Sequence, residues 1–194
     1  MPTPLLEMTL EELWQLFPIQ LSEHNDDWAN WYEEEKVRLL SLLENYIARI
    51  DHIGSTYVKD LLAKPIIDIL LQVNTNADIS AVKEILLSDG WLLMAENSNY
   101  GELDLNKGYT PEGFAKKVYH LHVRREGDWD ELYFRDYLAI HPEAVAEYAK
   151  LKQSLLTKYE HNRDAYTEAK TDFVKSCTEK ARAQVNINSI LPKY

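Results

Sequence analysis

Asp68 is the residue of this sequence best suited to chemistry, because it is an acid inside an apolar run. The run is PIIDILLQV, residues 65–73. A carboxylate in such a strand is costly to bury unless it is paired, neutralised or bound to a metal. Two interpretations stay open. Asp68 is either a metal-binding, catalytic carboxylate or an acceptor of hydrogen bonds from the turn at residues 54–56.

Two histidines offer further metal ligands. His120 and His122 stand one residue apart in the alternating segment VYHLHV, so both side chains point to the same face of a predicted strand. With Asp68 they make a set of two histidines and one carboxylate, which suits Mn²⁺, Fe²⁺ or Zn²⁺ better than Mg²⁺. Ordinary hydrogen bonds are the alternative for both histidines. Asp104 is a further carboxylate nearby, expected on a solvated face.

The segment HIGST, residues 52–56, has the composition of an anion-binding turn. Gly54 and Ser55 would present backbone N–H groups at a helix N-terminus, and the hydroxyls of Ser55 and Thr56 would add donors. The alternative is a tight strand-to-helix turn that uses Gly54 for its backbone freedom and Ser55 as a cap. Lys64 precedes the Asp68 strand and would neutralise a phosphate held by this turn.

The elements needed to position these side chains can be predicted from periodicity and capping. Strands are expected at 46–53, 65–73, 91–95, 103–109 and 118–123, and helices at about 28–44 and 79–87. The last third is expected to be helical, with Asp128 and Glu131 as a capping box, Pro142 opening the next helix, and a final helix beginning near Asp164. This order predicts an α+β (mixed α/β) domain. We expect an N-terminal extension with a short helix at 1–24, the domain at 25–185 and a tail at 186–194.

The composition limits the classes of partner. The chain has 194 residues, 45% hydrophobic and 27% charged, which indicates one globular domain. A formal charge of −11 argues against extended nucleic acid but leaves room for a small phosphorylated ligand. The sequence contains no apolar run of about 20 residues and no export signal, so no membrane association is expected. Cys177 is the single cysteine and is expected to act as a small hydrophobe, so a cytoplasmic location is predicted.

Several segments together resemble the GrpB family. They are HIGST (52–56), LAKPIIDI (62–69), HLHV (120–123), FRDYL (134–138), HP (141–142), EYAKLK (147–152) and YTEAKT (166–171). The resemblance covers roughly residues 25–185. It implies a nucleotidyltransferase-like fold, in which a small mixed sheet is flanked by helices and the active site lies at the sheet edge. Fusion of some members to dephospho-coenzyme A kinase is consistent with nucleotide metabolism.

The resemblance also implies which residues hold the ligand. A nucleoside triphosphate is the expected small ligand, with Mg²⁺ or Mn²⁺, or else Zn²⁺, as the divalent metal. Its phosphates need cations, and the candidates besides Lys64 are Arg135, Lys152 and Lys170. Surface positions are the default for Lys152 and Lys170, and a meeting of the two across adjacent helices is the alternative. Arg135 is either a phosphate fork or part of an internal Arg–Asp pair, and the internal pair is slightly favoured.

Two departures from the family pattern affect the functional hypothesis. Nucleotidyltransferases usually carry a second carboxylate two residues after the first, where this chain has Leu70. The family typically has Pro-Gly where this chain has Lys59-Asp60, which predicts a more polar and differently shaped loop. The leading hypothesis is transfer of a nucleotidyl or phosphoryl group to an unidentified acceptor. The alternatives are a non-catalytic nucleotide- or protein-binding regulatory module and a metal-dependent hydrolase built on Asp68, His120 and His122.

Overall fold

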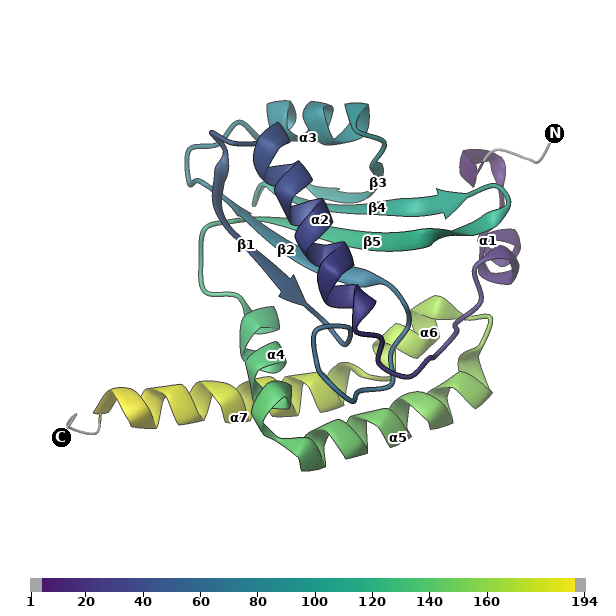
Figure 1. The fold of residues 1–194 in the computed structure, drawn as a ribbon, viewed down its shortest axis with the longest axis vertical. Helices are drawn as coiled ribbons and strands as arrows, with labels where there is room; N and C mark the ends of the chain where they lie inside the picture. Colours follow the sequence, from purple (N-terminus) through teal and green to yellow (C-terminus); the bar gives the residue numbers. More distant parts are fainter. Residues whose placement is uncertain (1–4, 191–194) are drawn as a thin grey trace.

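A five-stranded mixed sheet carries the central core of the molecule (Figure 1). The structure, a computed structural model, describes residues 5–190, with the side chains of all of these except residue 6 and residues 186–190. The strands are β1 (Ile47–Ile53), β2 (Ile67–Val73), β3 (Leu92–Asn97), β4 (Glu102–Thr110) and β5 (Gly113–Arg125). Their order in the sheet is β1-β2-β5-β4-β3. The β2 and β5 strands are parallel, and the other neighbouring pairs are antiparallel.

The apolar run around Asp68 forms the strand β2, as predicted. Its residues from Ile69 to Val73 are buried, because helices and neighbouring strands cover both faces of the sheet there. The strands predicted at 46–53, 91–95, 103–109 and 118–123 are all present, and the last of them is longer than expected. The predicted α+β class is therefore confirmed.

Helices lie on both sides of this sheet. They are α1 (Leu10–Leu16), α2 (Asp27–Leu42), α3 (Ile79–Ser88), α4 (Asp130–Ile140), α5 (Pro142–Tyr159), α6 (Arg163–Glu168) and α7 (Thr171–Ile190), after a 3-10 turn at Leu5–Glu7. Figure 1 shows α4 to α7 gathered on the side toward which β1 points, with α2 crossing the sheet. Within residues 5–190, no helix is both long enough and apolar enough to cross a membrane.

Two hydrophobic clusters hold the layers together. The first lies between the sheet and α2 and α3, and includes Trp28, Leu39 and Leu86, each at most 1% exposed. The second joins α4, α5 and α7, and it contains Cys177, which is buried as expected. The loop at 54–66 belongs to both clusters. It gives Val58 and Leu61 to the helical cluster and Ala63 to the sheet cluster.

The helical third differs from the prediction in three places. The expected final helix is two helices, because the chain breaks between α6 and α7 at the turn formed by residues 169–170. The expected capping box is wrong, because the N-cap of α4 is Trp129 without a side-chain hydrogen bond, and Asp128 binds Arg182 instead. The expected tail is helical up to Ile190, and residues 191–194 lie outside the described part of the chain.

Candidate functional site

Gly54 and Asp68 meet where β1 ends and β2 begins. Gly54 has a φ of +71°, and a Cβ at this position would lie 2.3 Å from Asp68 Oδ2. Only glycine therefore combines this backbone with so close a carboxylate. The expected helix after this turn is wrong, since residues 54–66 form successive turns and a single β-bridge at Ala63. Ser55 and Thr56 thus do not stand at a helix N-terminus.

Asp68 is held by a chain of hydrogen bonds across the sheet. Its Oδ1 lies 3.0 Å from His120 Nδ1, and His120 Nε2 lies 2.7 Å from the hydroxyl of Tyr109. Arg163 donates to the same hydroxyl at 2.9 Å. Because β2 and β5 pair Asp68 with His120 in register, the two side chains share one face of the sheet. Both nitrogens of His120 are therefore occupied.

Burial and hydrogen bonding determine the protonation states of the residues in this hydrogen-bonded series. Burial lowers the pKa of His120 more than its bond to Asp68 raises it, so the imidazole is neutral at pH 7. Burial raises the pKa of Asp68, but the hydrogen bond from His120 and the nearby positive charge of Lys64 outweigh it and lower the pKa to about 2. Asp68 is consequently ionised. A neutral His120 can donate from Nδ1 and accept from Tyr109 at Nε2.

The histidines do not assemble the expected metal site with Asp68. His122 lies opposite Asp104 in the β4–β5 register, and its Nδ1 is 2.8 Å from Asp104 Oδ1. Arg124 binds the same oxygen at 2.7 Å, so Asp104 is an ion-pair partner, and its side chain remains 39% exposed. Among residues 5–190, no three His, Cys, Asp or Glu side chains converge into a metal site. The two-His, one-carboxylate interpretation is thus replaced by two separate Asp–His pairs.

Lysines gather around Asp68 from three parts of the chain. Lys64 comes from the loop before β2, Lys152 from α5, and Lys170 from the turn before α7. Burial first, and the charges of Lys170 and Arg163 second, lower the pKa of Lys64 to about 7. Burial, Lys170 and Lys64 likewise lower the pKa of Lys152 to about 7, and burial lowers that of Lys170. Lys152 and Lys170 therefore lie near each other, as in the alternative to the default surface positions.

These lysines lack the acidic partners that buried cations usually have. Within residues 5–190, other lysines form ion pairs, but Lys64, Lys152 and Lys170 form none. Lys152 is 3% exposed, and its ammonium donates to Ser55 Oγ at 3.1 Å and to the carbonyl of Leu62. Several buried cations around a single carboxylate leave an excess of positive charge.

Two tyrosines form the wall between these lysines. The Tyr166 ring lies 4.6 Å from Lys170 Nζ and 5.8 Å from Lys64 Nζ, measured from the ring centroid. The Tyr148 ring centroid lies 4.6 Å from Lys152 Nζ. The Tyr166 hydroxyl is buried and has no hydrogen-bond partner among the described residues. A buried donor without a partner is costly, so this hydroxyl also indicates a missing acceptor.

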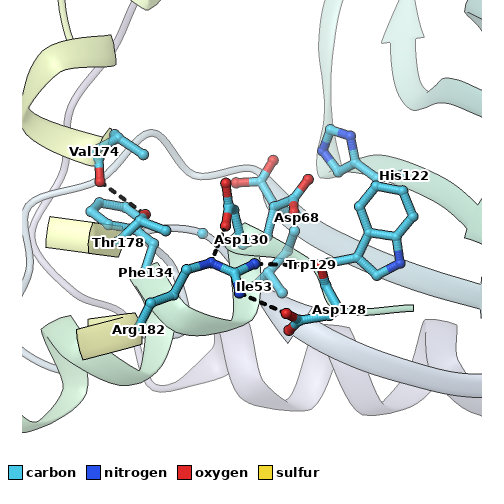
Figure 2. Close-up of a pocket in the computed structure, with 12 residues that line it drawn as sticks. Ile53, Asp68, His122, Asp128, Trp129, Asp130, Phe134, Val174, Thr178 and Arg182 are labelled. Atoms are coloured by element: carbon cyan, nitrogen blue, oxygen red, sulfur yellow. Dashed lines mark hydrogen bonds and ion pairs between the residues drawn. The ribbon is translucent and has the colours of Figure 1, made fainter. Parts of the chain in front are cut away.

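A cleft of about 690 Å³ opens on Asp68 from the side of α4 and α7. Figure 2 shows the Asp68 carboxylate facing Trp129 and His122, with Arg182 held by Asp128 and Asp130 at the far wall. The lining also includes Gly54, Glu131 and the apolar side chains of Ile53, Phe134 and Val174. The cleft is therefore an aromatic and acidic chamber that reaches Asp68, and Lys64, Lys152 and Lys170 are not among its lining residues.

Two predicted site residues lie outside this cluster. Arg135 Nη1 is 3.2 Å from both Asp51 Oδ1 and the carbonyl of His52, and its Nε is 2.7 Å from Asp136. Arg135 is thus part of an internal Arg–Asp pair and does not act as a phosphate-binding fork. Thr56 is 2% exposed, and its hydroxyl bonds to His52 and to the carbonyl of residue 66, so it is no ligand donor.

Sequence reasoning missed Arg163 and Tyr109 as parts of the site. Arg163 begins α6, which Asn162 caps by accepting from the backbone N–H of Ala165. The Asn-x-x-Ala spacing is a signal for that helix start, but it does not show that Arg163 would face β4. Tyr109 ends a strand and reaches His120 only because β4 and β5 are adjacent and staggered there.

Known proteins match this chain over most of its length. The family model described as GrpB protein matches residues 18–180. The UPF0157 protein YqkA of Bacillus subtilis is 32% identical over 179 residues, which cover 89% of this chain and 51% of YqkA. The chain therefore spans about half the length of this relative.

Solved structures agree with this family match. The crystal structure of conserved protein GrpB from Enterococcus faecalis has a TM-score of 0.73 at 28% identity, covering 86% of this chain and 99% of that one. The Cid1 poly(U) polymerase, solved with MgGTP bound, has a TM-score of 0.50 at 10% identity, covering 77% of this chain and 47% of Cid1. This second likeness concerns the fold alone, which is nucleotidyltransferase-like. The chain is a member of the GrpB family.

Proposed function

We propose that this protein binds a nucleoside triphosphate, or a similarly phosphorylated small molecule, at the lysine cluster. We further propose that it transfers a nucleotidyl or phosphoryl group to an acceptor in the adjoining cleft. The observation that carries the proposal is a group of three lysines that form no ion pair among the described residues: Lys152, which is buried, and Lys64 and Lys170, which are half-buried. Such a group lowers stability unless an anion balances it.

Phosphate oxygens would satisfy each unusual feature of the cluster. Their negative charge would raise the pKa of Lys64 and Lys152 back toward the ordinary value of 10.5, so the bound state would hold fully charged lysines. Tyr166 would gain an acceptor for its hydroxyl. The N-terminal end of α7, directly after Lys170, would add the positive end of a helix dipole.

Asp68 lies where the lysine cluster and the 690 Å³ cleft meet, which is the place for the reacting phosphate. An acceptor in the cleft would approach that phosphate from the side of Trp129 and Phe134. Because the pKa of Asp68 is about 2, this carboxylate is suited to electrostatic and ligand roles rather than to accepting a proton.

The residues do not fit a metal centre built by the protein alone. Asp68 is one carboxylate, Leu70 is fully buried at the position of the second, and both nitrogens of His120 are occupied. Asp68 does fit the lesser role of single protein ligand to Mg²⁺ carried by a triphosphate, which uses hard oxygen donors. Bound Mg²⁺ would supply charge neutralisation of the phosphates. We therefore favour Mg²⁺ over Zn²⁺.

A second candidate function is a binding module that keeps the fold without transfer. The lone carboxylate favours it, because two-metal transfer needs more acids than this site offers. The Lys59-Asp60 loop gives the binding module less support, because the predicted change of loop shape is smaller than the sequence suggested. Asp60 has a φ of 61°, so the turn keeps the left-handed backbone that glycine adopts most easily.

Thermal unfolding of the pure protein against ATP, CTP, GTP and UTP, with and without Mg²⁺, tests the proposal. A nucleotide at about 100 times its Kd adds about 2.7 kcal/mol to the free energy of unfolding, or roughly 5–10 °C in Tm for a domain of this size. Lys170→Gln should lose most of this shift. The matched control is Lys175→Gln, which removes an exposed lysine from the same segment.

The outcomes separate the two candidate functions. A wild-type protein that no nucleotide stabilises, or a Lys170→Gln variant with an undiminished shift, would sink the binding proposal. Stabilisation combined with release of pyrophosphate or phosphate, lost in Asp68→Asn, would establish transfer. Stabilisation without turnover across a set of hydroxyl and amine acceptors would favour the binding module.

A further inference from the structure

A second, smaller pocket lies on the other side of Lys64, outside the cleft described above. Its volume is about 180 Å³, which corresponds to about six water molecules at roughly 30 Å³ each. Apart from Gln20, the residues that line it are basic or apolar, and the basic ones are Lys64, Lys116 and Arg163. No aspartate or glutamate lines this pocket. Its size and charge suit one or two phosphate groups.

The cations of this pocket have donors to spare. Arg163 uses one guanidinium nitrogen for the Tyr109 hydroxyl, and within residues 5–190 neither Arg163 nor Lys116 forms an ion pair with a carboxylate. Lys117, the next residue on β5, points the other way and pairs with Glu34. Lys116 is exposed and lines both this pocket and the groove against α2, whereas Lys117 lines only that groove.

The pocket meets the lysine cluster at one shared residue, Lys64. Lys64 lines the pocket, and the charges of Lys170 and Arg163 lower the pKa of Lys64, so these cations lie in one electrostatic unit. Tyr166, with its unpartnered hydroxyl, lies against Lys64 and Lys170 within the same unit. An anion long enough to reach from Asp68 to the pocket would pass Lys64, the residue that the pocket and the lysine cluster share.

We propose that the Lys64–Lys116–Arg163 pocket binds the far phosphates of a polyphosphate chain, and that the natural ligand carries several phosphates in a row. This inference rests on the proposed function and narrows its substrate class from phosphorylated molecules to nucleoside triphosphates or longer polyphosphates. Phe114 and the segment at Pro18 and Gln20 close the outer wall, so the pocket holds the end of the chain rather than a base.

Calorimetric titration with inorganic phosphate and tripolyphosphate tests this subsite. The buffer contains EDTA, so that metal binding does not contribute. Lys116→Gln should weaken tripolyphosphate binding about three- to tenfold and leave orthophosphate binding within twofold, because orthophosphate needs the lysine cluster alone. Arg163→Gln should weaken tripolyphosphate binding more than tenfold. Lys117→Gln is the matched control and should bind both probes as the wild type does.

Failure of the subsite and failure of the proposed function give different results. If Lys116→Gln and Arg163→Gln bind tripolyphosphate like the wild type while Lys170→Gln does not, the subsite is wrong and the lysine cluster stands. A loss in Lys117→Gln equal to that in Lys116→Gln would also overturn the subsite, because it would reflect net charge. If the wild type binds neither probe, the proposed function itself fails.

Discussion

Replacing Lys64 by Met should make the unliganded protein more stable and insensitive to phosphate. Among the described residues, the Lys64 ammonium donates no hydrogen bond and contacts the face of Tyr166, so Met keeps the packing of the stem and removes the charge. Burial and the neighbouring Lys170 and Arg163 make that charge unfavourable in the folded state. The same charge is solvated in the unfolded chain.

The size of the effect follows from the pKa of Lys64. A fall from 10.5 to about 7 corresponds to roughly 5 kcal/mol, at about 1.36 kcal/mol per tenfold change in proton affinity. The long side chain can turn toward the adjacent pocket and recover part of this penalty. We therefore expect Lys64→Met to raise the free energy of unfolding by about 1–2 kcal/mol, or roughly 2–8 °C in Tm.

The gain should depend on pH in a defined direction. Between pH 7 and pH 10.5 the unfolded chain binds the Lys64 proton and the folded protein does not, so wild-type stability rises with pH in this window. The advantage of Lys64→Met should be greatest below pH 7 and should disappear above pH 10.5. Chemical unfolding at pH 6.5 and 9.5 measures the difference.

Lys59 offers a matched control for the Lys64→Met variant. Lys59→Met removes an exposed lysine from the same loop and should change stability by less than about 0.5 kcal/mol. If Lys64→Met lowers stability by about 1 kcal/mol or more, or binds tripolyphosphate like the wild type, then Lys64 is not an uncompensated cation of a phosphate site.

Three further predictions concern pH and the backbone. Sulfate stays a dianion between pH 6 and 9. Its binding, measured by calorimetry, should be at least about tenfold weaker at pH 8.5 than at pH 6.5, because Lys64 and Lys152, each with a pKa of about 7, lose their protons. Gly54→Ala should cost about 2 kcal/mol or more in chemical unfolding, whereas Gly90→Ala, with similar φ but open space around it, should cost about 1 kcal/mol. Asp60→Gly should raise stability by a few tenths to about 1 kcal/mol by relieving its left-handed backbone, and an unchanged denaturation midpoint would contradict that reasoning.

The sequence predicted the strands and helices of this fold better than the breaks and contacts between them. Period-two and period-3.6 patterns gave every strand and most helices, because each element buries an apolar face that the pattern records. The break at Lys170 between α6 and α7 was missed, because the residues around it, Ala169 and Thr171, carry no strong stop signal. Without that break Lys170 would not turn into the lysine cluster.

The sequence indicated the charged residues of the candidate site, but it did not indicate which side chains pair with one another. Asp68 was singled out because a carboxylate inside an apolar strand is costly to bury, and Lys64, Lys152 and Lys170 were proposed because a triphosphate needs cations nearby. The pairing of His122 with Asp104 was missed, because strand periodicity shows which side chains share a face but not which residue lies opposite on the next strand. Register is a property of the assembled sheet.

The loop at 54–66 makes the protein a single cooperative unit. Its side chains are embedded in both hydrophobic clusters, so the sheet layer cannot open from the helical layer without extracting Val58 and Leu61 from one cluster or Ala63 from the other. A polyphosphate bound between Lys64 and Lys152 would further link the sheet layer to the helical layer. Hydrogen exchange in β2 and α5 should then slow together on binding, as in one foldon that spans both layers.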